Sequence, residues 1–287
     1  MSFFTALSGM RNAETDLRVI SQNIANAETV GFKKSKASFG DLVANGGSTD
    51  PRLTPGIGSA VLAITQDFSV GQIQQTGRGL DQAINGDGYF ATFNPVSQTT
   101  SFTRNGSFRA VAPADTGPLE LQDAVGGLVL GFAAAADGSI TPPAAFPPIP
   151  ASDARILIPR TLDPADPASP QLASLSIDDR GTIFATYANG ETRTIARIAL
   201  ASFPSNDGLR PVGQTKWEAS GESGNPSYGE PGVGNLGFLF AGALERSNVD
   251  LATEMVSLLT AQRNFQANAR AIDTATAISQ TVLNLQR

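Results

Sequence analysis

Apolar residues recur at intervals of three or four along the C-terminal stretch 247–287, which contains no proline or glycine. This spacing places them on one stripe of an α-helix. Ser247 is expected to be the N-cap, with Asp250 near the positive end of the helix dipole. Such a helix would be roughly 55–60 Å long, about twice the width of a small domain, so we expect it to need a partner helix. The stripe consists of Leu251, Met255, Leu258, Phe265, Ala269, Ile272, Ile278, Val282 and Leu285.

A second stretch, residues 2–27, follows the same period at the other end of the chain. Ser2 is available as its N-cap, whereas Gly9 lowers the helix propensity within it. Its apolar stripe contains Phe3 or Phe4, Leu7, Met10, Leu17, Ile20 and Ile24. The sequence therefore predicts one amphipathic helix at each end of the chain.

The polar faces of both predicted helices carry few charges. The charged side chains are Asp250, Glu254, Arg263, Arg270, Asp273 and Arg287 in the long helix, and Arg11, Glu14, Asp16 and Arg18 in the short one. Helices that face water usually carry more Glu and Lys on their outer positions. A solvent-facing surface helix is the alternative, but we favour two helices that pack together and are covered by neighbouring subunits. The expected assembly interface comprises Phe3, Leu7, Met10, Leu17, Ile24, Leu251, Met255, Leu258, Phe265, Ile272 and Leu283.

The middle of the chain lacks the helical period. Gly31 is expected to end the first helix, and residues 31–70, which are rich in Gly, Ser and Pro, predict an extended, irregular connector. Turn residues punctuate the rest: Asn-Gly and Asp-Gly at 85–88 and Asn-Gly at 105–106 predict tight hairpin turns. Residues 141–150 and 163–170 are proline-rich loops. We expect strands at 80–84, 89–93, 101–104, 107–109, 128–132, 155–158, 173–178, 182–187 and 192–203.

These elements predict an α+β fold. Residues 1–30 and 247–287 would form a discontinuous coiled-coil domain of the N- and C-terminal helices. Residues 71–246 would form a central all-β domain without a helix of any length, reached through the 31–70 connector. The helices share an unusual composition and lie at opposite ends of the chain, so the middle is predicted to be a long excursion out of one helix pair.

Composition argues against catalytic chemistry. The chain has no cysteine and no histidine, and its net charge of −6 disfavours nucleic-acid binding. The GxGxxG pattern at 232–237 lacks the βαβ context of a dinucleotide site, and Asp178-Asp179 is interpreted as part of a turn. Lys33, Lys34 and Lys36 are interpreted as subunit contacts or a solvated face. We therefore predict no catalytic, cofactor-binding or metal site, no enzyme activity and no membrane insertion. The N-terminus also lacks the features of a cleaved signal peptide.

Several motifs together resemble one family. They are residues 2–10 (SFFTALSGM), 16–26 (DLRVISQNIAN), 29–33 (TVGFK), 80–90 (LDQAINGDGYF), 242–251 (GALERSNVDL) and 261–268 (AQRNFQAN). With them the chain is similar to the axial proteins of the bacterial flagellum, the rod and hook family, and most closely to its hook members. Hook members usually carry an additional outer β domain, for which the 133–170 segment is too short.

The resemblance implies an open helical homopolymer, a hollow tube lined by the paired terminal helices. As a hook, the tube would be a flexible coupling that transmits torque from rod to filament. The implied partners are further copies of the chain, rod and hook–filament junction proteins, a hook cap and the flagellar type III export apparatus. The implied location is the extracellular hook or the basal body. A distal rod subunit is the alternative within the family, and a secreted β-rich binding module on a coiled-coil stalk is the alternative of another class.

Overall fold

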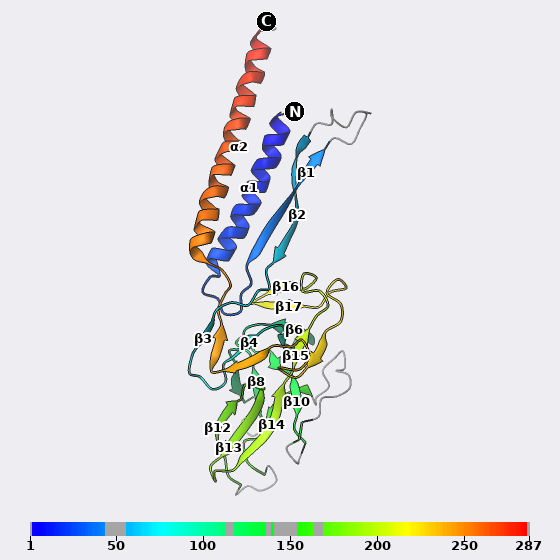
Figure 1. The fold of residues 1–287 in the computed structure, drawn as a ribbon, viewed down its shortest axis with the longest axis vertical. Coiled ribbons are helices and arrows are strands. Elements are labelled where there is room, and N and C mark those ends of the chain that lie inside the picture. The colour runs from blue at the N-terminus through cyan, green and yellow to red at the C-terminus, as the bar shows by residue number, and fades with distance from the viewer. Residues whose placement is uncertain are drawn as a thin grey trace. The chain divides into compact units, whose positions relative to one another are not determined.

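The computed structural model describes residues 2–43, 56–112, 117–135, 139–140, 154–163 and 169–285, without the side chains of 2, 282, 283 and 285. The predicted proline-rich loop 141–150 lies outside these residues. The chain divides into two compact units (Figure 1). Unit 1 combines residues 1–28, 33–69 and 248–287, and unit 2 combines residues 29–32 and 70–247. The predicted α+β fold, with terminal helices and a central β-rich part, is confirmed.

Two antiparallel helices run along unit 1: α1 (Ser2–Ala25) and α2 (Leu251–Leu285). Their register is marked by two contacts, because Gly9 lies against Asn268 and Asn23 binds Glu254. Since α2 has 35 residues and α1 has 24, the end of α2 runs past the beginning of α1. All side chains from 276 to 281 are accordingly exposed.

The first turn of α2 corrects one expectation. Asp250, not Ser247, caps the helix: its Oδ1 accepts the backbone N–H of Thr253 at 2.7 Å, and its carbonyl accepts that of Glu254 at 2.9 Å. Both residues fit the pattern of a helix start, but residues 246–250 are not helical. The hydrogen bond from Thr253 also lowers the pKa of the Asp250 carboxyl, as expected for an anion at a helix N-terminus.

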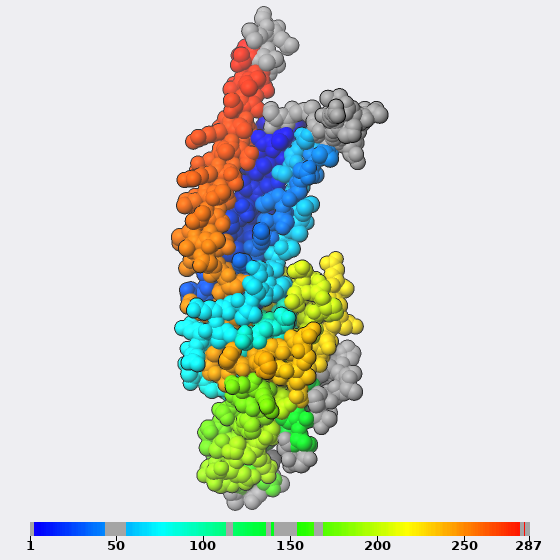
Figure 2. Space-filling view, in the orientation of Figure 1, coloured from blue at the N-terminus to red at the C-terminus, as the bar shows by residue number. Residues whose placement is uncertain are grey.

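A long strand pair replaces the irregular connector expected over 31–70. Strand β1 (Ser35–Val43) pairs antiparallel with β2 (Gly56–Gln66), and the ladder runs from Ser35↔Gln66 to Val43↔Gly56 with two register shifts. The glycine and serine residues that indicated a loop let β2 approach α1 instead. The Asn12 Nδ2 donates to Ser59 Oγ at 2.7 Å. A side chain at Gly58 would collide with Ser8. Helix α1 thus lies between α2 and the β1–β2 pair (Figure 2).

Unit 2 is built from short strands in four sheets of the described chain. A four-stranded sheet has the order β10-β14-β13-β12, and the largest sheet contains β11-β8-β9-β5-β6-β17-β16 with β7, β15 and β18 attached. Two further pairs are β19-β4 and β20-β3. The bounds are β3 Ile73–Gln75, β4 Gln82–Asn85, β5 Tyr89–Asn94, β6 Thr99–Thr103, β7 Arg109–Val111, β8 Leu119–Gln122, β9 Leu128–Val129, β10 Gly131–Ala133, β11 Leu157–Ile158, β12 Leu172–Ile177, β13 Thr182–Tyr187, β14 Thr192–Ile198, β15 Leu200–Ser202, β16 Arg210–Gly213, β17 Lys216–Glu218, β18 Ser227–Gly229, β19 Phe238–Ala241 and β20 Ala243–Glu245.

The hydrophobic core belongs to unit 2. It is one cluster of buried side chains drawn from both larger sheets and from β4 and β19. Its members are Ile84, Phe90, Phe108, Leu121, Val129, Ile156, Ile158, Ile177, Ile183, Ala196, Ile198, Leu200 and Leu239. Unit 2 therefore has the means to fold on its own, because it buries large apolar side chains against one another.

Two predicted hairpins are wrong, although their strands exist. β4 pairs with β19 and β5 pairs with β6, β9 and β15, so the turn at 85–88 connects two different sheets. Likewise β6 and β7 do not pair with each other. The positive φ angles expected of Gly86 and Gly88 are present. By contrast, β12 pairs with β13 and β13 with β14, each with its neighbour in the chain. Local turn chemistry therefore identified the turns but not the partners of every strand.

A buried ion pair joins Glu245 to Arg104 within unit 2, and hydrogen bonds of Glu245 connect two further segments to it. The Glu245 Oε2 lies 3.3 Å from the Arg104 Nη1, and both side chains are almost fully buried. Glu245 Oε1 also accepts the backbone N–H of Gly71 at 2.9 Å, and its carbonyl accepts that of Gly31 at 2.8 Å. The segment 29–32 is thereby held within unit 2, although the residues on either side of it belong to unit 1.

Candidate assembly core formed by the terminal helices

The inward face of α2 is a heptad stripe. Its members alternate in steps of four and three along the helix, which is the spacing of a coiled-coil seam. They are Glu254, Leu258, Ala261, Phe265, Asn268, Ile272 and Ala275, of which only Ala261 is fully buried. Large apolar and small or polar residues are thus interleaved on the face that meets α1.

The buried positions of α1 are mostly small or neutral: Ala6, Asn12, Ala13, Val19, Ile20 and Asn23. Small side chains let two helix backbones come close but bury little apolar area. The backbone of Gly9 marks such a close approach, because a Cβ placed on it would lie 2.7 Å from Asn268 Oδ1. Unit 1 is therefore closely packed along this seam without a cluster of large buried side chains among its described residues.

The residues predicted to form the assembly interface are distributed over both helices. Leu7, Met10, Leu17, Ile24, Leu258, Phe265 and Ile272 are half-buried. Phe3, Leu251 and Met255 are exposed to 43%, 41% and 55%, and the side chain of Leu283 lies outside the described part. None of the ten described residues is fully buried within one chain. The helix pair alone therefore leaves apolar surface in contact with water.

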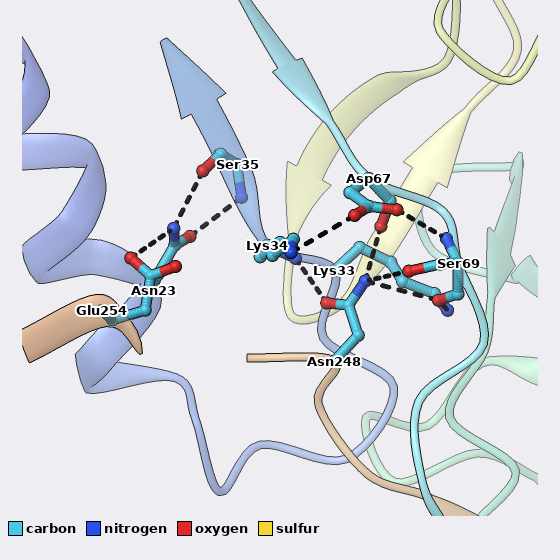
Figure 3. Close-up of polar contacts among 8 residues, drawn as sticks. All are labelled: Asn23, Lys33, Lys34, Ser35, Asp67, Ser69, Asn248 and Glu254. Atoms are coloured by element: carbon cyan, nitrogen blue, oxygen red, sulfur yellow. Dashed lines mark hydrogen bonds and ion pairs between the residues drawn. The ribbon is translucent and has the colours of Figure 1, made fainter. Parts of the chain in front are cut away.

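A polar cluster lies where the helices begin and end, and we call it the basal cluster: Asn23, Lys33, Lys34, Ser35, Asp67, Ser69, Asn248 and Glu254 (Figure 3). Asn23 joins three elements within it. Its Oδ1 accepts the backbone N–H of Ser35 at 2.8 Å, and its Nδ2 donates to the Ser35 carbonyl at 2.8 Å and to Glu254 Oε2 at 3.3 Å. The last turns of α1, the start of β1 and the first turn of α2 are thus tied together.

Asn248 makes the second set of ties, two residues before the cap of α2. Its Oδ1 accepts the backbone N–H of Lys34 at 2.8 Å. Its Nδ2 donates to the carbonyl of Asp67 at 2.8 Å and lies 3.1 Å from Ser69 Oγ and 3.3 Å from the Ser69 carbonyl. One amide therefore connects the segments that precede β1, follow β2 and precede α2.

The three lysines expected on a solvated face or at subunit contacts have different environments. Lys33 is 1% exposed and its Nζ donates to the Ser69 carbonyl at 2.6 Å, so for this residue the expectation of a solvated face is wrong. Lys34 forms an ion pair with Asp67 at 3.4 Å, and Lys36 is exposed. A run of lysines in a sequence indicates a basic surface. Lys33 is buried because the chain passes it again at Ser69, whose carbonyl it binds.

Asp67 shows how this cluster responds to pH. Hydrogen bonds from the backbone and side chain of Ser69, followed by the charge of Lys34, hold the pKa of the Asp67 carboxyl below its ordinary value. A lowered folded-state pKa stabilises the fold above the ordinary value. This contribution is lost as the pH falls through the lowered pKa. It is small, because 40% of the Asp67 side chain is exposed to water.

The remaining motifs act as turns. Within the GxGxxG pattern, the Gly232 N–H donates to the Gly237 carbonyl at 3.0 Å, and strand β19, not a helix, follows directly. Asp178 Oδ1 accepts the N–H groups of Arg180 and Thr182 at 3.0 and 2.7 Å, as expected of a turn residue. A search of the described residues for three or more acidic side chains that could hold a metal ion identified no group. No described helix is long and apolar enough to span a membrane.

The two ends that form the helix pair also match known families. A family model described as "Flagella basal body rod protein" matches residues 3–33, and one described as "Flagellar basal body rod FlgEFG protein C-terminal" matches residues 241–285. The Bacillus subtilis protein named flagellar basal-body rod protein FlgG is 34% identical over 299 residues, which cover 100% of this chain and 99% of that protein. The chain belongs to the flagellar rod and hook family.

Hook members of the rod and hook family are similar over their full length as well. The flagellar hook proteins FlgE of Escherichia coli and Salmonella typhimurium are 28% and 27% identical over 410 and 411 residues, with 100% of each chain covered. A solved Helicobacter pylori hook protein FlgE2 aligns at 13% identity over 71% of this chain and 46% of its own, with a TM-score of 0.21, too low to support an argument. Membership of this structural family places the chain in the bacterial flagellum as a non-enzymatic subunit.

Replacing Gly9 with Ala is expected to have an effect whose size depends on residue 268. In the otherwise unchanged chain, the new methyl group would displace the Asn268 side chain, which cancels the gain of about 1 kcal/mol in helix propensity. In an Asn268→Ala background, the same substitution should raise the free energy of unfolding by about 1 kcal/mol. Thermal melts followed by circular dichroism at 222 nm, where the helices of unit 1 dominate, measure both. Equal effects in both backgrounds would contradict the contact.

Replacing Asn248 with Ala is expected to lower the free energy of unfolding of unit 1 by about 1–2 kcal/mol, because partly buried backbone groups of Lys34 and Asp67 lose their partner. Asn248→Asp should cost at least as much, since a carboxylate cannot donate to the carbonyls of Asp67 and Ser69. Asn264→Ala, at an exposed position of α2, is the control and should stay within about 0.5 kcal/mol. The same melts at 222 nm provide the measurement, and equal losses at Asn248 and Asn264 would argue against the ties.

Proposed function

We propose that this chain polymerises head to tail into a hollow helical tube of the flagellar axis. The observation that supports this is the distribution of large apolar side chains in unit 1. Those exposed in one chain are Phe3, Phe4, Phe39, Leu42, Val43, Ile57, Val61, Leu62, Ile64, Leu251, Met255, Val256, Leu259 and Ile278. Exposed apolar surface on this scale is typical of an interaction site, and both helices and the β1–β2 pair contribute to it.

The kind of polymer follows from where these residues lie. Those on α2 and those on the β1–β2 pair form different surfaces of unit 1, so the contact between two copies joins unlike surfaces. Such heterologous contacts generate rings or, where the rotation does not close, open helical assemblies. Unit 2, with its own buried core, need not take part in the inner contacts.

Within the flagellar axis, the position we propose is the hook, the flexible coupling that transmits torque from rod to filament. It is supported by the terminal motifs at 2–10 and 242–251 and by the full-length similarity to two hook proteins. The partners of this role are further copies, rod and hook–filament junction proteins, a hook cap and the type III export apparatus, which would export the chain without a cleaved signal peptide.

A distal rod subunit is the second candidate, and a specific observation favours it. The Bacillus subtilis FlgG aligns with this 287-residue chain over 299 residues, whereas the hook proteins require 410 and 411. The hook relatives thus contain over a hundred residues without a counterpart here (410 − 287 = 123). The alternative of a secreted binding module has no comparable support.

Deleting residues 250–287 is expected to abolish tube formation and leave a soluble monomer with unit 2 folded. The deletion removes the exposed apolar residues of α2, whereas the buried hydrophobic cluster of unit 2 remains intact. Electron microscopy and sedimentation measure assembly, and the fluorescence of Trp217, the single tryptophan and a buried residue of unit 2, reports folding. Tubes formed by the truncated chain would count against the proposal.

The two positions in the axis predict different structures in a strain that lacks this protein. If it is the hook subunit, we expect isolated basal bodies to end at a complete rod tip. If they end before the rod is complete, the distal rod role replaces the hook role. Electron microscopy of basal bodies from the deletion strain gives the answer. Re-expression of the intact chain is the control and should restore the missing segment.

A further inference from the structure

A groove runs along α1 between β1 and α2, entirely within unit 1. Its cavity volume is about 520 Å³. The floor is formed by α1, with Asp16, Val19 and Ile20, and the walls include Phe39 of β1 and Val256 of α2. The groove therefore combines apolar side chains with a carboxylate, and it is open to the outside of the helix pair.

Two of the four charged side chains that line the groove have a partner. Glu254 accepts a hydrogen bond from Asn23, and Lys34 forms an ion pair with Asp67. The side chains of Asp16 and Lys36 form no hydrogen bond or ion pair with any described residue. Burial raises the pKa of the Asp16 carboxyl, with no charged neighbour contributing to the shift. A half-buried carboxylate without a cation is unfavourable, so a basic side chain entering the groove would be stabilised there.

The outer face of α2 offers a matching element. Leu259, Arg263, Gln266 and Arg270 recur in steps of four and three, so they share one stripe, and all four are exposed. Arg263 and Arg270 form no ion pair in the described structure. Arg11 and Arg18 of α1 differ, because Glu14 lies within one turn of both and forms an ion pair with Arg18. The stripe thus presents free arginines beside apolar Leu259.

One chain cannot bring Arg270 of this stripe to its own groove. The contacts of Gly9 with Asn268 and of Asn23 with Glu254 give an antiparallel register that places Asp16 opposite Ala261, a buried position on the inner face of α2. Arg270 lies more than two turns further along and on the opposite face of the helix, so only a second copy can bring it to Asp16. Arg263 differs, because it lies on the same side of α2 as Val256 and Thr260, which line the groove of their own chain.

We propose that the groove receives the outer stripe of α2 from a second copy of this chain, with Asp16 binding Arg270 of that copy. Leu259 of the entering helix would pack against Phe39 and Val256, which are exposed on the walls of the groove, and this adds apolar burial to the ion pair. Groove and stripe are different surfaces, so the contact is heterologous and can repeat without closing. The inference deepens the proposed tube and rests on it.

The test uses the full chain and charge reversal. Asp16→Lys is expected to raise the critical concentration for tube formation on the order of tenfold or more, because it places two cations together where a pair existed. Arg270→Glu should have a similar effect alone. Combined with Asp16→Lys in one chain, it should restore assembly to near the wild-type concentration. Glu14→Lys, an exposed acid of α1 outside the groove, should change it less than twofold.

Each outcome has a definite meaning when assembly is measured by sedimentation and electron microscopy. Wild-type chains that never form tubes overturn the proposed function and this contact with it. Tubes formed equally well by wild type and Asp16→Lys overturn the contact alone. So does an Asp16→Lys defect that Arg270→Glu does not correct, or one that Arg263→Glu or Lys36→Glu corrects, which would make a residue of the same chain the partner. Circular dichroism at 222 nm confirms that each variant retains its helices.

Discussion

The antiparallel pairing of the two chain ends is the constraint on which the rest of this structure depends. A helix that begins at residue 2 and one that ends at residue 285 can meet only if everything between them returns to its starting point. The polar ties of Asn23 and Asn248 secure that return within unit 1. Hydrogen bonds with fixed geometry suit this task, because they set a register that apolar contacts between small side chains would leave undefined.

The two units handle apolar surface in opposite ways. Unit 2 buries its large side chains in one cluster and places a buried ion pair, Arg104–Glu245, where distant segments meet. Unit 1 buries mainly alanine and asparagine along α1 and leaves phenylalanine, leucine and methionine exposed. A domain that is complete as a monomer would not distribute its residues in this way. The arrangement suits a family whose members serve as parts of an axial structure.

Much of the fold could be predicted from local signals. Helical periods identified both helices, and alternation and turn residues identified most strands of unit 2. The errors arose where a local signal had two meanings. Gly-rich 56–60 reads as a loop but provides the close approach of β2 to α1, and the turn at 85–88 reads as a hairpin but connects two sheets. In each case the deciding contact comes from a segment distant in the sequence.

The sequence by itself determined the fold class, the family and the absence of histidine and cysteine chemistry, because these depend on periodicity, motifs and composition. Only the tertiary structure decided that Lys33 is buried and that Asp16 lies in a groove without an ion-pair partner. The physical reason is that burial and partnership of a polar group are properties of the space around it. That space is enclosed by chain segments more than two hundred residues away, whose approach no local pattern encodes.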